Sequence, residues 1–374
     1  MEYTAEQAHL PDGGATIRRL PGVEGVGNPH KALFAATRAI DVDRVAVIGP
    51  RGVPAAIWAA RSGAHVTYIA DSAAVAQSLS ATLRENGLPH VPSMPDWRLA
   101  DLQAGACDLA LLHLPRGREL QSQLIQLTAT LLVPGGRLVL MGAKNEGIKG
   151  AVKEAARVFG RAGVVARKGG FHAAIAFRRS GEVPMPEVCF ASHEVVVGGE
   201  PTELIACAGA FAPDRVDGGA AALIAAIVAD KRIAAGSSVL DLGCGTGLVA
   251  LAAARLGANV QATDVSARAI ESARRTLAAN EQPHVALHHC PGAAAVPDAS
   301  VDTVVTNPPF HAGHDVSFEV SRLFVREARR VLVPGGRVFL VANQGLDYGR
   351  WLREQFDEVG TAYETSRFRL WCAR

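Results

Sequence analysis

An internal repeat constrains the fold of this 374-residue chain more than any other feature of its sequence. Residues 45–91 align with residues 239–285 at a constant offset of 194, and Leu132–Arg137 is repeated as Leu332–Arg337 at an offset of 200. The matches include Ala59-Ala60-Arg61 with Ala253-Ala254-Arg255, Ser72-Ala73 with Ser266-Ala267, Asn86 with Asn280, and Pro89-His90-Val91 with Pro283-His284-Val285. The chain is therefore predicted to be a tandem duplication.

Each copy alternates short runs of β-branched residues with alanine-rich stretches of helical length. In the second copy we expect strands at 238–242, 258–264, 301–306 and 337–342, helices at 248–256, 266–280 and 318–331, and a turn at 333–336. This alternation predicts an α/β fold with a mostly parallel, doubly wound sheet in each copy and ligands at the carboxyl ends of the strands. The proline-containing stretch 180–186 separates the copies into domains 1–186 and 187–374.

Composition and cysteine spacing exclude several other classes of protein. Hydrophobic residues make up 49% of the chain and charged residues 20%, which is enough apolar material for two full cores. We expect neither a membrane span nor secretion, because no run of about 18 apolar residues and no basic and apolar leader are present. The six cysteines form no closely spaced pair, which favours a reducing cytoplasm over a disulfide framework.

The second copy carries a glycine-rich segment, Asp241–Gly247, at the end of its first expected strand. Glycine lets the chain turn sharply and lets a ligand approach the backbone closely. Asp264 ends the next expected strand, where a carboxylate can accept hydrogen bonds from both ribose hydroxyls of an adenosine ligand. The pattern acidic-x-Gly-x-Gly-x-Gly resembles the cofactor loop of class I S-adenosylmethionine-dependent methyltransferases; a nicotinamide site or a simple tight turn is the alternative.

Directly after the strand expected at 301–306 comes Asn307-Pro308-Pro309-Phe310. The prolines stiffen this loop, so an Asn side-chain oxygen and a Pro carbonyl can act as paired acceptors for one NH2 group. Such a pair can orient a conjugated amine, which is a poor nucleophile, toward a sulfonium methyl group. Phe310 can stack on a flat substrate. We therefore assign catalytic roles to Asn307, Pro308 and Phe310.

The first copy lacks this chemistry. At the same offset Asp241 becomes Val47, Gly245 becomes Arg51 and Asp264 becomes Ala70, while His113-Leu114-Pro115-Arg116 replaces the Asn-Pro-Pro-Phe segment. We therefore expect a degenerate domain that binds no cofactor. Residues 137–179 contain ten basic and two acidic residues. This basic segment either contacts RNA or forms a solvated helix face.

A degenerate copy before an active copy bearing Asn-Pro-Pro-Phe resembles the bacterial 16S rRNA guanine-N2 methyltransferase C family. The resemblance spans both copies and is strongest over 207–374, where it includes Asp217-Gly218-Gly219, Val341-Ala342-Asn343 and Arg367-Phe368. It implies two tandem Rossmann-like class I methyltransferase domains. It also implies transfer of a methyl group from S-adenosylmethionine to N2 of one guanosine in 16S rRNA, on the 30S subunit, with S-adenosylhomocysteine as product.

The resemblance also assigns the site. Asn307 and Pro308 would hold the guanine amine and Phe310 would stack on the base. The expected cofactor-binding residues are Asp241, Gly243, Gly245, Gly247, Asp264, Val265, Cys290 and Asn307. The segment His288–Pro291 departs from the family pattern, which usually places Asp or Asn there for the adenine amine.

Several alternatives remain open on the sequence alone. The large-subunit (23S) rRNA counterpart shares the duplicated plan, and DNA adenine-N6 and protein glutamine-N5 methylation use the same acceptor geometry. A noncatalytic RNA-binding ribosome-assembly factor is the alternative from a different class. We expect a cytoplasmic monomer. We also expect no metal site, because the spacing of His288, His289, Cys290, His311 and His314 matches no usual zinc pattern.

Overall fold

The computed structural model describes residues 2–24, 28–37, 39–95, 103–181, 189–309, 314–345 and 348–374. The chain forms two compact units, Met1–Val188 (unit 1) and Cys189–Arg374 (unit 2). The boundary expected from the sequence, between residues 186 and 187, lies outside the described residues.

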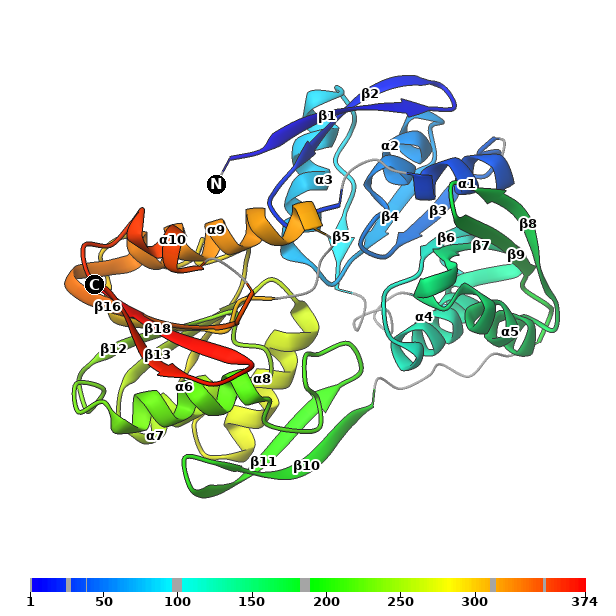
Figure 1. The fold of residues 1–374 in the computed structure, drawn as a ribbon. Coiled ribbons are helices and arrows are strands. Elements are labelled where there is room, and N and C mark those ends of the chain that lie inside the picture. Colours follow the sequence, from blue (N-terminus) through cyan, green and yellow to red (C-terminus); the bar gives the residue numbers. More distant parts are fainter. Residues whose placement is uncertain are drawn as a thin grey trace. The chain divides into compact units, whose positions relative to one another are not determined.

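Unit 1 consists of a β-hairpin, a short helix and a seven-stranded sheet covered by helices (Figure 1). The strands are β1 (Thr4–Leu10), β2 (Gly13–Arg19), β3 (Arg44–Ile48), β4 (His65–Ile69), β5 (Ser93–Met94), β6 (Cys107–His113), β7 (Leu132–Ala143), β8 (Ala162–Lys168) and β9 (Phe171–Phe177). The helices are α1 (Asn28–Ala36), α2 (Val53–Arg61), α3 (Ala73–Glu85), α4 (Arg118–Leu131) and α5 (Ile148–Phe159), with a 3-10 turn at Lys144–Glu146.

Unit 2 repeats this arrangement (Figure 1). Its strands are β10 (Phe190–Val197), β11 (Glu200–Cys207), β12 (Ser238–Leu242), β13 (Asn259–Asp264), β14 (Ala286–His289), β15 (Val301–Thr306), β16 (Leu332–Asn343), β17 (Val359–Glu364) and β18 (Phe368–Ala373). Its helices are α6 (Gly218–Ala229), α7 (Leu248–Arg255), α8 (Ala267–Ala279), α9 (His314–Val331) and α10 (Tyr348–Arg353).

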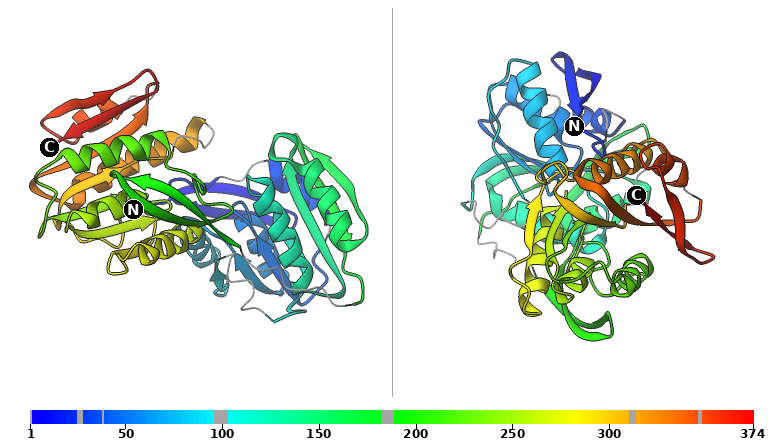
Figure 2. Two further views of the ribbon diagram at one scale, coloured as in Figure 1. Left: turned by 90° about the horizontal axis from the view of Figure 1, so that it is seen from below. Right: turned by 90° about the vertical axis from the view of Figure 1, so that its left-hand side faces the viewer.

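The two sheets have the same topology. Their strand orders are β5-β4-β3-β6-β7-β9-β8 and β14-β13-β12-β15-β16-β18-β17. In each sheet the first five strands of this order are parallel, the sixth (β9 or β18) is antiparallel to both its neighbours, and the edge strand (β8 or β17) runs in the same direction as the first five; Figure 2 shows β17 and β18 of unit 2 in red. The prediction of a duplicated α/β fold with two mostly parallel, doubly wound sheets is confirmed.

One local prediction was wrong. Residues 333–336 were expected to form a turn, but β16 begins at Leu332 and runs through them. The strand accommodates the Pro-Gly-Gly sequence by a register shift against β15 between Val301 and Thr303, and Gly335 adopts a φ of +79°. The segment therefore forms an irregularity inside a long strand, a position where proline and glycine are tolerated.

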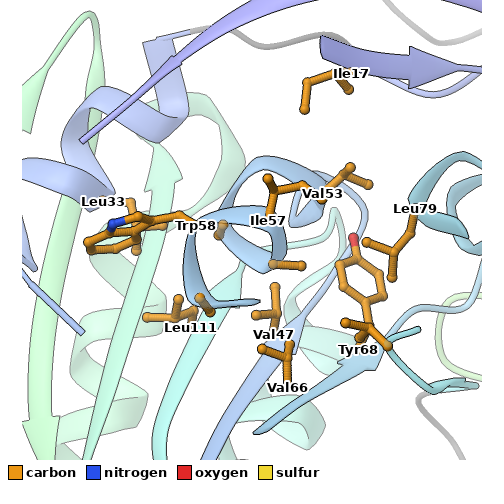
Figure 3. Close-up of a cluster of buried hydrophobic side chains, with 14 of the residues drawn as sticks. Ile17, Leu33, Val47, Val53, Ile57, Trp58, Val66, Tyr68, Leu79 and Leu111 are labelled. Carbon is orange, nitrogen blue, oxygen red and sulfur yellow. The ribbon is translucent and has the colours of Figure 1, made fainter. Parts of the chain in front are cut away.

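Side chains alternate along the strands and pack into a hydrophobic core on each face of the sheet. In unit 2, Val239 and Val341 pack toward α6, α7 and α8, whereas Leu240 and Leu340 pack toward α9 and α10. Such near-continuous apolar strands are typical of a parallel sheet buried on both faces. Figure 3 shows one core of unit 1, where Trp58 of α2 lies near Leu111 of β6.

A polar stripe on one helix attaches the hairpin of each unit. In unit 2 the hydroxyl groups of Ser272 and Thr276 and the Oδ1 of Asn280 accept hydrogen bonds from the backbone N–H groups of Cys207, Ile205 and Glu203. In unit 1 Ser78, Thr82 and Asn86 do the same for the N–H groups of Leu20, Arg18 and Thr16. The spacing of four residues places each set on one helix face. These contacts give a structural reason for the repeated Asn86 and Asn280.

In the part of the chain that the structure describes, no helix is long and apolar enough to cross a bilayer.

Candidate active site

The predicted site residues of unit 2 lie at the carboxyl ends of β12, β13 and β15. The chain passes from β12 to β13 on one side and later returns to β15 on the other, so the strand order reverses beside β12. The side chain of Thr306, the last residue of β15, donates a hydrogen bond of 2.7 Å to the carbonyl of Leu242. This bond joins the strand before Asn307 to the strand before the glycine-rich loop, at the place where doubly wound sheets bind ligands.

The glycine-rich loop is held by β13 and is open on one side. The backbone N–H groups of Gly243 and Cys244 both donate to the carbonyl of Thr263, at 2.8 and 3.0 Å. Gly245 has a φ of +54°, and a Cβ placed on it would meet no heavy atom within 4 Å. Glycine is needed here by the backbone conformation, and the open side leaves room for a ligand against the loop.

Gly247 has a different role. Its φ is +82°, and a Cβ there would lie 2.9 Å from the Cβ of Ala273. Gly247 therefore allows α7 to approach α8 closely, and we assign its contribution to packing behind the loop. The sequence motif alone could not separate this packing glycine from the open one at position 245.

The carboxylate of Asp264 is tied to the backbone around it. One oxygen accepts a hydrogen bond of 2.9 Å from the N–H of Gly245, and the other accepts one of 2.8 Å from the N–H of Ser266. Burial raises the pKa of Asp264 above its ordinary value, against the effect of these bonds. Each oxygen keeps a second lone pair, so the group can still accept from a ligand hydroxyl.

Asp241 lies deeper, with 2% of its surface exposed. Its Oδ2 accepts a hydrogen bond of 2.9 Å from the N–H of Ala250 in α7. Burial, together with the nearby charge of Asp264, raises the pKa of Asp241 to about 7. The carboxyl group therefore connects β12 to α7. Burying its charged form costs free energy, and this cost is reduced when the group binds a proton or a hydrogen-bond donor.

Asn307 presents a buried acceptor, its Oδ1, that has no partner among the residues described. Its Nδ2 lies 3.5 Å from Oδ2 of Asp217, while no described residue donates a hydrogen bond to its Oδ1. A buried amide oxygen without a donor costs free energy, on the order of 1–3 kcal/mol. The next residue, Pro308, is buried. This unsatisfied oxygen is the feature of the site that most directly indicates a missing hydrogen-bond donor.

The segment Asp217-Gly218-Gly219 holds Asn307 in place. Asp217 caps α6, accepting a hydrogen bond of 2.8 Å from the N–H of Gly219 through its other carboxylate oxygen. A Cβ on Gly219 would lie 2.8 Å from Nδ2 of Asn307, and one on Gly218 would lie 2.7 Å from the ring of Phe368. Both glycines therefore allow close approach of neighbouring side chains.

A small pocket of about 40 Å³ brings part of the predicted set together. It is lined by the predicted residues Asp241, Gly243, Gly245 and Asn307. Phe211 and Asp217 also line it, as do Ala212 and Arg215; no sequence signal indicated the last two. The remaining cofactor predictions Gly247, Asp264, Val265 and Cys290 do not line this pocket, and Phe310 lies outside the described residues.

Cys290 is turned into the protein next to the site. It is buried, its thiol lies 3.7 Å from the carbonyl of Gly292, and its N–H donates to the carbonyl of Asp264. The pKa of this thiol and that of the buried Cys244 in the loop are raised by burial, so neither is a ready thiolate nucleophile. Among the described residues, no three His, Cys, Asp or Glu groups form a cluster that could hold a metal ion.

Comparison with known proteins relates this geometry to one group of enzymes. Over 99% of this chain and 98% of that one, with a TM-score of 0.84 and 28% identity, the structure matches a T. thermophilus 16S rRNA N2 methyltransferase solved in complex with AdoMet and guanosine. A ribosomal RNA small subunit methyltransferase C from Alcanivorax borkumensis is 30% identical over 81% of this chain and 91% of its own length. The chain belongs to the ribosomal RNA small subunit methyltransferase C family.

Other relatives in this family agree with that assignment. One from Pseudomonas aeruginosa is 32% identical over 72% of this chain and 80% of its own length. The model of the methyltransferase small domain matches residues 201–371, which run from β11 to β18 of unit 2. The resemblance predicted from the sequence motifs is confirmed.

Proposed function

We propose that this chain transfers the methyl group of S-adenosylmethionine to the exocyclic N2 of a guanosine in 16S rRNA, with S-adenosylhomocysteine as the second product. Membership of the methyltransferase C family supports the reaction and its substrate class. The single observation that carries the chemistry is the buried Oδ1 of Asn307, which has no donor among the described residues. A guanine NH2 group would supply that donor.

The acceptor loop positions the amine. The nitrogen of guanine N2 is a poor nucleophile because its lone pair is delocalised into the ring. Oδ1 of Asn307 and the carbonyl of Pro308 can accept its two N–H bonds, which points the nitrogen at the methyl carbon for in-line attack. The new carbon–nitrogen bond replaces the carbon–sulfur bond, whose electron pair stays on sulfur, and water takes the extra proton from nitrogen.

The residues of the glycine-rich loop fit the cofactor. S-adenosylmethionine supplies a methyl group already activated by a positively charged sulfur, so the transfer itself requires no metal. The open side of Gly245 leaves space along the loop, and Asp264 has lone pairs available for ribose hydroxyls. We include Gly243, Asp241, Val265 and Cys290 in the proposed cofactor site, the last two through their positions beside Asp264.

Phe310 remains our proposed stacking residue for the guanine. In unit 1 Arg51 stands in place of Gly245, and His113 stands in place of Asn307. We therefore propose that this unit binds no cofactor. One unit supplies both the cofactor loop and the acceptor loop, and a monomer therefore suffices. An rRNA substrate places the activity in the bacterial cytoplasm, on assembled or assembling 30S subunits.

The test is transfer of labelled methyl from S-adenosylmethionine to unmodified 30S subunits, 50S subunits and protein-free rRNA, followed by nucleoside analysis. We expect N2-methylguanosine in the 16S rRNA. Label confined to 50S subunits would support the 23S counterpart instead. Cofactor binding without label in any RNA would redirect the search to DNA or protein, and no cofactor binding at all would leave a noncatalytic assembly factor.

A further inference from the structure

Unit 1 carries a group of basic side chains at the carboxyl edge of its sheet. We define the basic edge as Lys144, Lys149, Lys153, Arg167 and Lys168, all of which are exposed. Lys144 directly follows β7, and Lys168 ends β8, which is parallel to β7 through the shared neighbour β9. Lys149 and Lys153 are four residues apart on α5, so they share a helix face.

His172 lies close to several of the positive charges of the basic edge. His172 pairs with Arg167 across β8 and β9. Partial burial and then the positive charges of Arg167, Lys144 and Lys149 lower its pKa. Three members of the basic edge, drawn from three different elements, therefore act on one imidazole.

The cations of the basic edge have no acidic partners in the described part of the chain. The two acidic residues between 137 and 179 are already used elsewhere: Glu146 pairs with Arg51, and Glu154 pairs with Arg157 at 2.7 Å. No ion pair involves any member of the basic edge among those described residues. Exposed like charges that remain unpaired repel one another and add nothing to fold stability.

The same place in unit 2 is arranged differently. From the repeated Leu-Val-Pro-Gly-Gly-Arg segment onward, residues 337–374 contain six basic and five acidic residues, against ten and two in residues 137–179. Glu364 ends β17 where Lys168 ends β8, and it pairs with Arg369 at 2.6 Å. The shared fold therefore does not require a basic edge at this position.

We propose that the basic edge of unit 1 binds backbone phosphates of the RNA substrate. This inference rests on the proposed function. It names residues of unit 1 that contact the RNA backbone, in addition to the loop of unit 2 that contacts the reacting base. Exposed lysine and arginine side chains bind phosphates without reading sequence, and they release counterions when they do so. The basic edge therefore supplies affinity and salt dependence, while the loop at Asn307 selects the amine.

The test uses the full chain with Lys144, Lys149, Arg167 and Lys168 all changed to Gln. We expect its affinity for protein-free 16S rRNA fragments to fall roughly 10- to 100-fold at moderate salt. The slope of log affinity against log salt should decrease in magnitude by about three. S-adenosylmethionine affinity and kcat at saturating RNA should stay at the parent values, with the loss confined to KM.

The matched control removes four positive charges from the amino edge of the unit 2 sheet, by changing Lys231, Arg232, Arg353 and Arg374 to Gln. A second control exchanges Lys and Arg at the four positions of the basic edge, which preserves charge. Both controls should bind RNA with nearly the parent salt slope. If the first control loses as much affinity as the test variant, the effect is one of total charge and the proposal is wrong.

Two other outcomes would also overturn it. Unchanged RNA affinity and salt slope would remove the phosphate contacts. Normal binding to protein-free RNA with weakened binding to 30S subunits would indicate an acidic protein surface as the partner. Failure of the proposed function has a separate signature, because the parent chain would then transfer no methyl to rRNA while its RNA binding could still be measured.

Discussion

The carboxyl edges of the two sheets differ in what fills the space next to the first strand. In unit 2 the loop after β12 turns on Gly245, which leaves open space beside it. In unit 1 the matching position is Arg51, whose guanidinium is held by ion pairs with Glu24 and Glu146. An ion-paired side chain thus replaces the space for a ligand.

A second substitution fills the loop from beneath. Tyr68 of unit 1 stands where unit 2 has Ala262. Its buried hydroxyl accepts a hydrogen bond of 3.1 Å from the N–H of Gly52 and donates one of 2.9 Å to the carbonyl of Gly49. The side chain therefore satisfies backbone groups of the loop from inside the protein, and burial raises its pKa.

The acceptor positions differ in the same sense. His113 stands where unit 2 has Asn307, and it is fully buried beside His30, with 5.8 Å between the ring centroids. Burial, with the nearby charges of His30 and Arg51, lowers its pKa well below the ordinary value, so the ring stays neutral. The shared fold therefore accommodates either an edge filled by side chains, as in unit 1, or an open edge, as in unit 2. At the open edge, Oδ1 of Asn307 is a buried acceptor with no donor among the described residues.

The largest effect is expected from removing that acceptor. Asn307→Ala should lower kcat about 100- to 1000-fold, because the amine loses one of the two groups that orient it. The affinity for S-adenosylmethionine should change little, since the glycine loop and Asp264 are intact. Single-turnover methyl transfer and calorimetric cofactor binding measure the two quantities.

The control for this prediction is the matching change in unit 1. His113→Ala should leave kcat at the parent value while lowering thermal stability, because it empties a buried position. Turnover that survives Asn307→Ala would sink the role assigned to this residue. Turnover lost equally in both variants would mean that unit 1 takes part in the chemistry.

A smaller effect is expected from Gly219→Ala. The added Cβ would lie 2.8 Å from Nδ2 and 3.0 Å from Oδ1 of Asn307, so the amide must move. We expect kcat to fall about 10- to 100-fold, with cofactor affinity little changed. Gly150→Ala on α5 is the control, because a Cβ there meets nothing within 4 Å and kcat should be unaffected. Parent-like turnover in the Gly219 variant would contradict the placement of Asn307.

The sequence predicted much of this architecture because two kinds of pattern are local. The strands at 238–242 and 301–306 were predicted with the bounds that the structure has, and the helix expected at 266–280 is α8, which Ser266 caps through a bond from the N–H of Ala269. Such features depend on neighbouring residues only. The glycine loop and Asn307 followed from short motifs at the ends of strands.

Other features depend on residues that are distant in sequence. The side-chain amide of Asn307 is held by Asp217, 90 residues away, which accepts a hydrogen bond of 3.5 Å from its Nδ2, and no motif encodes that contact. The hairpins β1–β2 and β10–β11 were not predicted, because their attachment depends on side chains of α3 and α8 far along the chain. Gly247 was predicted to bind the cofactor, and its close approach to Ala273 gives this glycine a packing role that the motif does not show.

The attachment of the hairpins provides a test of what the two units share. The side-chain amide of Asn86 bonds the backbone of Thr16 in both directions, and that of Asn280 does the same with Glu203. We expect Asn86→Ala and Asn280→Ala each to lower the free energy of unfolding of their own unit by about 1–2 kcal/mol. Calorimetry of each variant, with cofactor added to mark the unit 2 transition, measures this.

Equal losses in the two variants would show that the clamp is a common part of the scaffold. A loss in one variant alone would contradict the structural equivalence inferred from the repeat. Kinetics add a second distinction. The Asn86 variant should retain the parent kcat below its melting transition, since its unit holds none of the proposed catalytic residues.

The smallest expected effect concerns Asp241, which unit 1 replaces with Val47. The pKa of Asp241 is raised from 3.8 to about 7 in the folded protein. The folded state therefore binds the proton more tightly than the unfolded state, and this contribution to stability is complete below pH 4 and is lost as the pH rises through 7. Between pH 6 and pH 8 the loss is about 1.4 kcal/mol, or roughly 3–5 °C in the Tm of unit 2.

Asp241→Asn should remove this part of the pH dependence, because an amide can still accept the hydrogen bond from the N–H of Ala250 without carrying a charge. Without cofactor, the Tm of unit 2 should thus rise more at pH 8 than at pH 6 relative to the parent. The unit 1 transition serves as the internal control, since Val47 does not titrate. An identical gain at both pH values would mean that Asp241 is already ionised at pH 6, and that its burial is compensated by more than the bond to α7.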